Sequence, residues 1–218
     1  MHTASAPRRI LATRRAEWAV RLARRLGGIG VTPNAVSIAG VTVALCTSAA
    51  FALAPATAGG SRAALLVAAA AGIQLRLLCN LLDGMLAVEE GLKSRTGEIY
   101  NELPDRIADV VILVGAGYSV RQLALGPILG WTAAVCALFT AYIRALAGSL
   151  RATQHFVGPM AKQHRMFALT VGTLAAAAEA RLNLAARAMC LALSLIVVGS
   201  IVTAIRRTWL MAAELEGR

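Results

Sequence analysis

The sequence has few charged residues, and this scarcity restricts the kind of protein it encodes. Only 15% of its 218 residues are charged, whereas 58% are hydrophobic and the mean hydropathy is +0.66. Because a typical soluble domain is roughly 25% charged, the composition excludes an ordinary soluble fold. It predicts an all-α integral membrane protein.

Residues and motifs of several common site chemistries are also missing. The four cysteines stand alone in apolar segments, without a CxxC pair or a nearby histidine, so a zinc site is excluded and we expect packing roles. No P-loop, dinucleotide-binding glycine motif or nucleophile elbow occurs. The isolated cysteines are Cys46, Cys79, Cys136 and Cys190.

Long apolar runs dominate what is present. Six of them approach the roughly 20 residues that a helix needs to cross a hydrocarbon core of about 30 Å. We therefore predict one membrane domain over residues 1–218, with an interfacial helix at 6–28 and a six-helix transmembrane bundle over 32–208. The spans are predicted at 34–54, 63–88, 98–118, 123–148, 164–180 and 185–205.

Basic residues outnumber acidic ones by 22 to 11, which gives a net charge of +11. If the N-terminus is cytoplasmic, most of these basic residues flank the cytoplasmic ends of the spans. This distribution predicts an integral protein of a bacterial inner membrane, with both termini cytoplasmic. It also favours anionic lipid headgroups over nucleic acid as the partner of the cations. The opposite side receives only Arg62, Arg121, Arg181 and Arg187.

The N-terminal segment has the pattern of an amphipathic helix. At 100° per residue, several arginines share one arc with Glu17, and Trp18 and Leu22 lie on the opposite arc. Such a helix is expected to lie in the membrane interface. An arginine-rich targeting peptide remains the alternative, although no cleavage signal is seen.

Seven of the eleven acidic residues fall between residues 80 and 110, inside and between the second and third predicted spans. A carboxylate in a membrane span is costly, so this placement indicates function. Periodicity puts the polar residues of each span on one helical face. Because the intervening loop is short, we expect these helices to be antiparallel neighbours whose polar faces meet at the cytoplasmic end. The two faces consist of Asn80, Asp83, Gly84 and Ala87, and of Gly97, Asn101, Asp105 and Asp109.

The side chains on these faces offer oxygen atoms without histidine or cysteine. Such ligands favour a hard cation, Mg²⁺ or Mn²⁺, which in turn attracts phosphates. The predicted metal ligands are Asn80, Asp83, Asn101, Asp105 and Asp109.

The stretch resembles the signature of the CDP-alcohol phosphotransferases: Asp, two residues, Asp-Gly, two residues, Ala-Arg, eight residues, Gly, three residues, Asp, three residues, Asp. Every spacing is kept here. The similarity extends to the six-helix layout and to Thr32 and Pro33, which open the first span. The matching residues are Asn80, Asp83, Gly84, Ala87, Val88, Gly97, Asn101 and Asp105.

The resemblance implies a homodimeric enzyme. Family members move a phosphoalcohol group from a CDP-alcohol, most often CDP-diacylglycerol, to an acceptor hydroxyl and release CMP. Four aspartates hold two divalent ions, and the last aspartate is the general base. By this resemblance Asp105 is the expected base, with Asp109 as second candidate, and Gly84, Ala87 and Gly97 border the substrate.

This chain departs from the family pattern at three positions. Asn80 and Asn101 replace aspartates, and Val88 replaces the arginine. Fewer carboxylates imply a single tightly held metal ion, or a second one recruited with the substrate diphosphate. Asp109, one turn beyond Asp105, offers a replacement carboxylate. Whether Arg76 replaces the missing guanidinium or only pairs with a carboxylate is left open by the sequence.

Cations near the fifth predicted span are candidates for binding the acceptor or lipid phosphates. Ordinary positive-inside flanking explains them equally well. These candidates are Arg144, Arg151, Lys162 and Arg165.

Two other functions compete with a transferase. An inactive relative that binds lipids or acts as a scaffold would keep the motif spacing and lose charges, as is seen here. A transporter would be expected to show inverted repeats, and none is apparent.

The sequence does not name the acceptor alcohol. For the dimer contact it offers the small residues Gly115 and Gly117, or Ala141 and Ala145.

Overall fold

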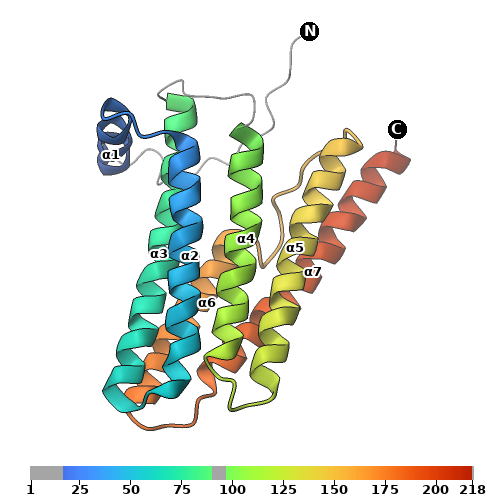
Figure 1. Ribbon diagram of the computed structural model, residues 1–218. Coiled ribbons are helices and arrows are strands. Elements are labelled where there is room, and N and C mark those ends of the chain that lie inside the picture. The colour runs from blue at the N-terminus through green and yellow to red at the C-terminus, as the bar shows by residue number, and fades with distance from the viewer. Residues whose placement is uncertain (1–16, 90–96, 218) are drawn as a thin grey trace.

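A computed structural model describes residues 17–89 and 97–217, which form helices and connecting segments without a strand. Six long helices run up and down beside one another, and a shorter helix lies against one edge of the bundle (Figure 1). The helices are α1 Glu17–Gly28, α2 Pro33–Leu53, α3 Gly59–Glu89, α4 Gly97–Tyr118, α5 Leu125–Ser149, α6 Lys162–Arg181 and α7 Ala188–Glu216, with a short 3₁₀ turn, η2, at Ala54–Ala56.

The six long helices pack into a closed ring in the order α2, α4, α5, α7, α6 and α3. Each helix therefore has two main neighbours. The expectation that α3 and α4 pack directly on each other is wrong for most of their length, because α2 lies between them. Small residues permit this: a Cβ on Gly72 of α3 would lie 2.1 Å from Thr47 Oγ1, and one on Gly115 of α4 would lie 2.4 Å from Ser48 Oγ.

Glycines at the contact of α4 with α5 allow the two backbones to approach closely. A Cβ on Gly117 would lie 2.7 Å from the Gly126 carbonyl oxygen and 2.8 Å from Gly130 Cα. Gly115 and Gly117 are thus used for packing within the chain. This corrects the suggestion that they form a dimer surface.

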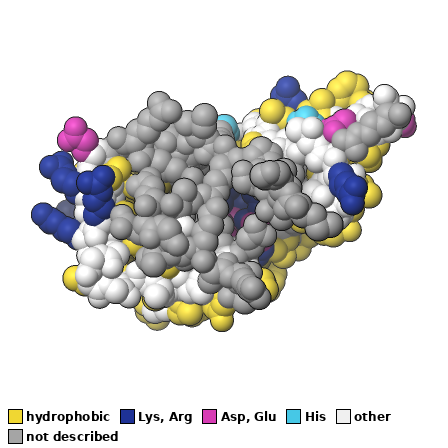
Figure 2. All heavy atoms as spheres, turned by 90° about the horizontal axis from the view of Figure 1, so that it is seen from above, with side chains coloured by type: hydrophobic (Ala, Val, Ile, Leu, Met, Phe, Trp, Pro, Cys, Tyr) yellow, Lys and Arg dark blue, Asp and Glu magenta, His cyan; other side chains and the backbone are white. Residues whose placement is uncertain are grey.

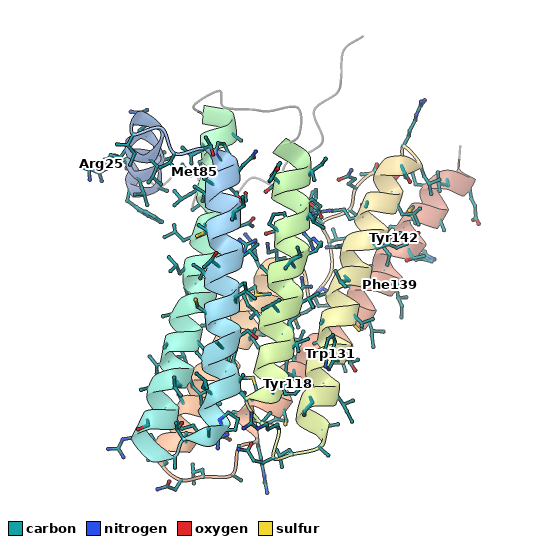
Figure 3. The ribbon with its side chains drawn as sticks, in the orientation of Figure 1. Arg25, Met85, Tyr118, Trp131, Phe139 and Tyr142 are labelled. Carbon is teal, nitrogen blue, oxygen red and sulfur yellow. The ribbon has the colours of Figure 1, made fainter. Side chains whose placement is uncertain are left out.

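Four helical segments within the described residues are long and apolar enough to cross a membrane: Pro33–Ala56, Gly59–Ala87, Leu125–Ser149 and Ala188–Glu216. With the composition, they identify an integral membrane protein. Helices α4 and α6 carry more charge, so six spans remain a prediction. Large side chains such as Trp131, Phe139 and Tyr142 project outward from α5 and are exposed (Figure 3).

Helix α1 covers the part of the predicted interfacial helix, 6–28, that the structure describes, and it packs on α3. Ala19 and Ala23 are buried and belong to one apolar cluster with Leu86 and Met85 of α3. Figure 3 shows Met85 between α3 and α1 and Arg25 pointing away from the bundle. Part of the apolar face of α1 is therefore covered by protein. The remainder of the predicted interfacial helix, 6–16, lies outside the described residues.

The predicted helix starts agree with the structure to within a few residues. Thr32 caps α2: its Oγ1 accepts a hydrogen bond from the Ala35 backbone N–H at 3.2 Å, and Pro33 is the first helical residue. Only α7 differs substantially, since it continues to Glu216 instead of ending at 205.

Candidate active site

Three carboxylates from the acidic stretch lie buried inside the ring: Asp83 on α3, and Asp105 and Asp109 on α4. Residues of both polar faces meet here, because the Asn80 side chain of α3 lies 2.9 Å from Asp105 Oδ1 of α4. The predicted convergence of the two polar faces is therefore present. It occurs across the ring interior, near the ends of α3 and α4 at which α1 also lies (Figure 1).

Asp105 is paired with cations from three helices. Arg76 of α3 donates to its Oδ1, Lys162 of α6 lies 2.5 Å from its Oδ2, and Arg106 of α4 lies 3.4 Å from the same oxygen. Arg76 is itself buried. Pairing of this kind offsets the cost of burying a charge in a low-dielectric interior.

The Asn80 side chain lies between Asp105 and Lys162. Oriented to suit both neighbours, its amide nitrogen donates to Asp105 Oδ1 at 2.9 Å, and its oxygen accepts from Lys162 Nζ at 3.2 Å. At this position a neutral amide joins a carboxylate to an ammonium group. An aspartate here would place a second negative charge against Asp105.

Asp109 lies one turn further into the bundle and is paired with Arg165 of α6. The distance from Arg165 Nη2 to Asp109 Oδ2 is 2.7 Å, and the two side chains are only 2% and 5% exposed. The predicted replacement carboxylate therefore joins the cluster with an arginine as its partner.

Asp83 differs from the other two carboxylates because its bound partner is neutral. The Ser37 hydroxyl of α2 donates to Asp83 Oδ2 at 2.7 Å. Asp83 Oδ1 is buried and has no hydrogen-bond partner within the described part of the chain. This oxygen is therefore open to a cation or a donor from a ligand.

The connection between α5 and α6 brings Lys162 and Arg165 into the ring, because it runs down between helices before α6 begins (Figure 1). Arg207 of α7 holds it through Nε, which donates to the Val157 carbonyl at 3.0 Å, and Thr203 Oγ1 accepts from the Met160 backbone N–H at 2.9 Å. Sequence reasoning missed this role: Arg165 was a candidate for binding phosphates or for membrane flanking, and Arg207 was given no role at the site. The pair Arg206 and Arg207, which follows the long apolar run of α7, was the available signal.

The other predicted site residues are less central. Arg144 of α5 donates to both carboxylate oxygens of Glu102, at 2.6 and 2.7 Å, and lies over the Phe156 ring. Asn101 and Arg151 are exposed, so the structure does not bring them into the buried cluster. Partly buried positions on α3 and α4 are occupied by Gly84, Ala87 and Gly97.

The side chains of this cluster do not provide the ligands for the two divalent ions that the family signature implies. Among the residues that the structure describes, no three carboxylate, histidine or cysteine side chains converge on one point. Both oxygens of Asp105 already contact cations, and Asp109 contacts Arg165. The donor set therefore fits one hard cation at Asp83, and it does not fit a pair of ions.

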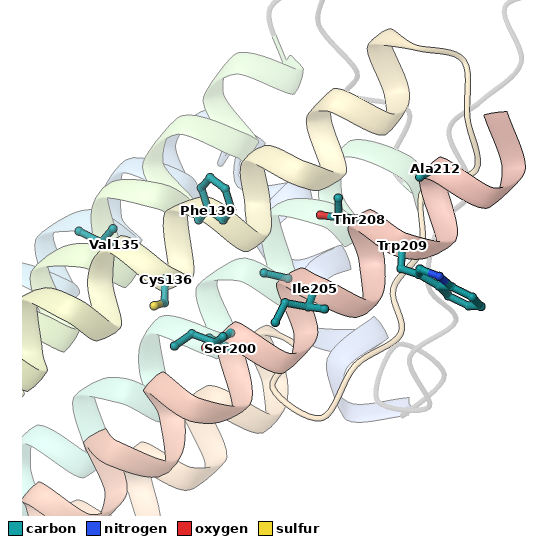
Figure 4. Close-up of a pocket in the computed structure, with 10 residues that line it drawn as sticks. Val135, Cys136, Phe139, Ser200, Ile205, Thr208, Trp209 and Ala212 are labelled. Carbon is teal, nitrogen blue, oxygen red and sulfur yellow. The ribbon is translucent and has the colours of Figure 1, made fainter. Parts of the chain in front are cut away.

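Seen along the ring axis, cationic and acidic side chains lie in a recess near the middle of this end of the molecule (Figure 2). A different hollow, of about 610 Å³, lies between α5 and α7 (Figure 4). Its lining is apolar apart from Ser200 and Thr208, so it does not suit phosphate chemistry. Other side chains on its wall are Val135, Cys136, Phe139, Ile205 and Trp209.

The arrangement defines a class: a helical membrane protein with a buried, charged pocket open toward one end of its bundle. The fold is that of Mycobacterium tuberculosis phosphatidylinositol phosphate synthase, PgsA1. With the structure of that enzyme with CDP-DAG bound, the TM-score is 0.73 at 24% sequence identity, covering 90% of this chain and 94% of that one. With the complex containing manganese and citrate, the TM-score is 0.73 at 22% identity, covering 88% of each chain. PgsA1 is a CDP-alcohol phosphotransferase, so the resemblance seen in the sequence is confirmed in the fold.

Sequence comparison gives a weaker relationship. No protein-family model matches the chain. It is 30% identical over 103 residues to the inner membrane protein YnbA of Escherichia coli K12, which is 47% of this chain. The chain spans about half the length of that relative.

Proposed function

We propose that the protein is a CDP-alcohol phosphotransferase that moves a phosphoalcohol group from a CDP-alcohol, such as CDP-diacylglycerol, to an acceptor alcohol and releases CMP. The observation that carries this proposal is the meeting of Asn80, Asp105 and Lys162 inside a ring with the fold of a protein crystallised with CDP-DAG. The proposed setting is a bacterial inner membrane with both termini cytoplasmic. A homodimer is expected from the family resemblance.

The transfer requires one bond to form and one to break. The acceptor oxygen bonds to the phosphorus of the phosphoalcohol group, and the bond from that phosphorus to the CMP oxygen breaks. In this proposal Asp105 takes the hydroxyl proton, with Asp109 as the second candidate. Substrate phosphates would draw Lys162 away from Asp105 and so free the carboxylate oxygen that accepts the proton.

For the cofactor we propose one Mg²⁺ or Mn²⁺ ion, held by Asp83 with Asp105 and Asn80 beside it. Such an ion neutralises charge on a diphosphate. Asn101 and Asp109 are weaker candidates as ligands, because Asn101 is exposed and Asp109 contacts Arg165.

Lys162 and Arg165 are proposed to bind phosphate groups of the acceptor or donor. Both project from the first turn of α6, whose N-terminal end carries the positive side of the helix dipole. Arg144, which pairs with Glu102, and the exposed Arg151 are proposed to bind phosphate groups as the substrate enters the pocket. Gly84, Ala87 and Gly97 are proposed to border the nucleotide.

The experiment is a transfer assay with purified protein in lipid nanodiscs. Supplied with CDP-diacylglycerol, Mg²⁺ or Mn²⁺ and a panel of acceptors (inositol phosphate, glycerol phosphate, serine and choline), the protein should release CMP with one of them. Asp83→Ala and Asp105→Ala should each reduce the rate at least about 100-fold. Full CMP release by both variants would refute the assignment of these residues.

A second candidate is an inactive relative that binds lipids or serves as a scaffold. The ion pairs of Asp105 with Lys162 and of Asp109 with Arg165 favour this candidate, because they already engage carboxylates that catalysis would need. This alternative predicts that CDP-diacylglycerol binds without CMP release under every combination of acceptor and metal ion.

A further inference from the structure

Arg76 is the one charged residue on the inward face of α3 that the family signature does not contain. It lies one helical turn before Asn80 and two turns before Asp83, and its guanidinium contacts Asp105. Gly40 of α2 leaves space for it, because a Cβ there would lie 3.4 Å from Arg76 Cζ. The cation is therefore built into the centre of the carboxylate cluster.

Part of this guanidinium has no protein partner. Arg76 Nε and Nη1 are buried and unpaired within the described part of the chain, as is Arg165 Nε. Leaving buried charged donors unsatisfied is costly. Phosphate oxygens are well suited to satisfy them, since each of these N–H groups can donate a charge-assisted hydrogen bond to a phosphate oxygen.

The charges of the cluster balance without any metal ion. Three buried carboxylates, Asp83, Asp105 and Asp109, face three cations, Arg76, Lys162 and Arg165. Arg106 also contacts Asp105, but it is matched by a further carboxylate, Glu102. In the family pattern, four aspartates balance two divalent ions. Two such ions added here would leave an excess of four positive charges in a low-dielectric interior, which is unfavourable.

Asn80 supports the same conclusion. Its amide donates to Asp105 directly, so no ion is needed between residues 80 and 105. The replacement of aspartate at residue 80 and the presence of Arg76 thus compensate each other.

We propose that Arg76 takes the place of one of the two divalent ions: it neutralises Asp105 and offers its free N–H donors to the substrate diphosphate. This inference rests on the proposed function, since it concerns how the same pocket holds a CDP-alcohol. It makes Arg76 a substrate-binding residue. It also makes diphosphate binding largely independent of divalent ions.

The test measures binding of CDP to the full-length protein in nanodiscs, in EDTA and in Mn²⁺. For the unmodified protein, the two dissociation constants should agree within about threefold, because the side chains supply most of the charge. Electron paramagnetic resonance should count no more than one bound Mn²⁺ per chain with CDP present. These two results need no variant.

Arg76→Met should weaken CDP binding in EDTA at least tenfold, and Mn²⁺ should restore most of the loss. Arg76→Met combined with Asn80→Asp should bind one more Mn²⁺ than the unmodified chain. Arg62→Met is the matched control: Arg62 is on the same helix, but its Nη2 donates to the Ser119 carbonyl at 3.2 Å, away from the pocket. CDP binding by this control should be unchanged.

The possible results distinguish a failure of the role proposed for Arg76 from a failure of the proposed transferase function. Two bound Mn²⁺ per chain, or CDP binding that disappears in EDTA, would overturn the role of Arg76 and leave a two-ion transferase standing. Failure of the folded protein to bind CDP in either medium would overturn the proposed function as well. Equal loss of binding in EDTA and Mn²⁺ for Arg76→Met would show that the residue only supports the fold.

Discussion

At the scale of single residues, Arg165 has the largest side chain that is fully buried in the described part of the chain. Its charge is balanced by Asp109. Removing one member of a buried pair leaves the other charge uncompensated, which costs about 3–5 kcal/mol. We therefore expect Arg165→Met to lower the free energy of unfolding by that amount, measured by denaturant titration in detergent.

The double variant Arg165→Met with Asp109→Leu serves as the control for this prediction. Replacing both charges with apolar side chains should recover most of the lost stability, because no unpaired charge remains. If the double variant were as unstable as the single one, the pair would not be the source of the effect.

The identity of the carboxylate residues was predictable from the sequence, but their partners were not. The spacing from Asp83 to Asp105 marked them as one cluster because helix periodicity fixes which residues share a face. Arg165 was a candidate for binding phosphates or for membrane flanking, and its pairing with Asp109 was not predicted, since its place in the chain gives no sign that the segment before α6 enters the ring. Contacts such as Ser37 with Asp83 join residues 46 positions apart and depend on packing.

At the scale of elements, the segment between α5 and α6 determines where the cations of α6 lie. Gly158 in this segment has a φ of +131°, and a Cβ there would lie 2.4 Å from Thr203 Cγ2. Gly158→Ala should therefore displace the segment and lower stability by about 1–3 kcal/mol. It should also slow CMP release, because Lys162 would shift relative to Asp105.

Gly60→Ala is the matched control for the Gly158 variant. Gly60 lies in the first turn of α3, and a Cβ there would meet nothing within 4 Å. Stability and the rate of CMP release should be unchanged, or stability slightly raised. An equal loss of stability in both variants would argue against a special role for the segment around Gly158.

Helix positions were predictable because apolar runs and caps are local signals, as Thr32 and Pro33 show at the start of α2. Which helices pack on each other was less predictable. Chain order suggested that α3 packs on α4, but small residues such as Gly72 and Gly115 let α2 fit between them. Sequence alone does not show which helix face meets which glycine.

At the scale of the whole molecule, α1 and the C-terminal end of α7 lie at the same end of the bundle (Figure 1). With the distribution of basic residues, this arrangement predicts that Gly217 is cytoplasmic and that Ala58 and Ala185 face the opposite side. Single cysteines at these positions, in a chain without its native cysteines, can be tested with a membrane-impermeant maleimide. In intact cells it should label Ala58→Cys and Ala185→Cys, and Gly217→Cys only after permeabilisation.

Labelling of Gly217→Cys in intact cells, with the other two positions protected, would reverse the predicted orientation. The charged pocket would then open to the side of the membrane opposite the cytoplasm. CDP-alcohols are not expected to be supplied on that side. The orientation test therefore also bears on the proposed substrate.

Helix α6 begins well below the end of the bundle that α7 reaches. The two helices are joined by a short connection at the far end, and their 20 and 29 residues correspond to lengths of about 30 and 43 Å. Helix α6 is therefore about 13 Å shorter than α7, by the same helix rise. On the proposed function, Lys162 in the first turn of α6 binds phosphate beside Asp105, below the end of the bundle that α7 reaches. The acceptor hydroxyl is accordingly expected to reach below that end, which favours a small metabolite or a lipid headgroup over an alcohol attached to a large molecule.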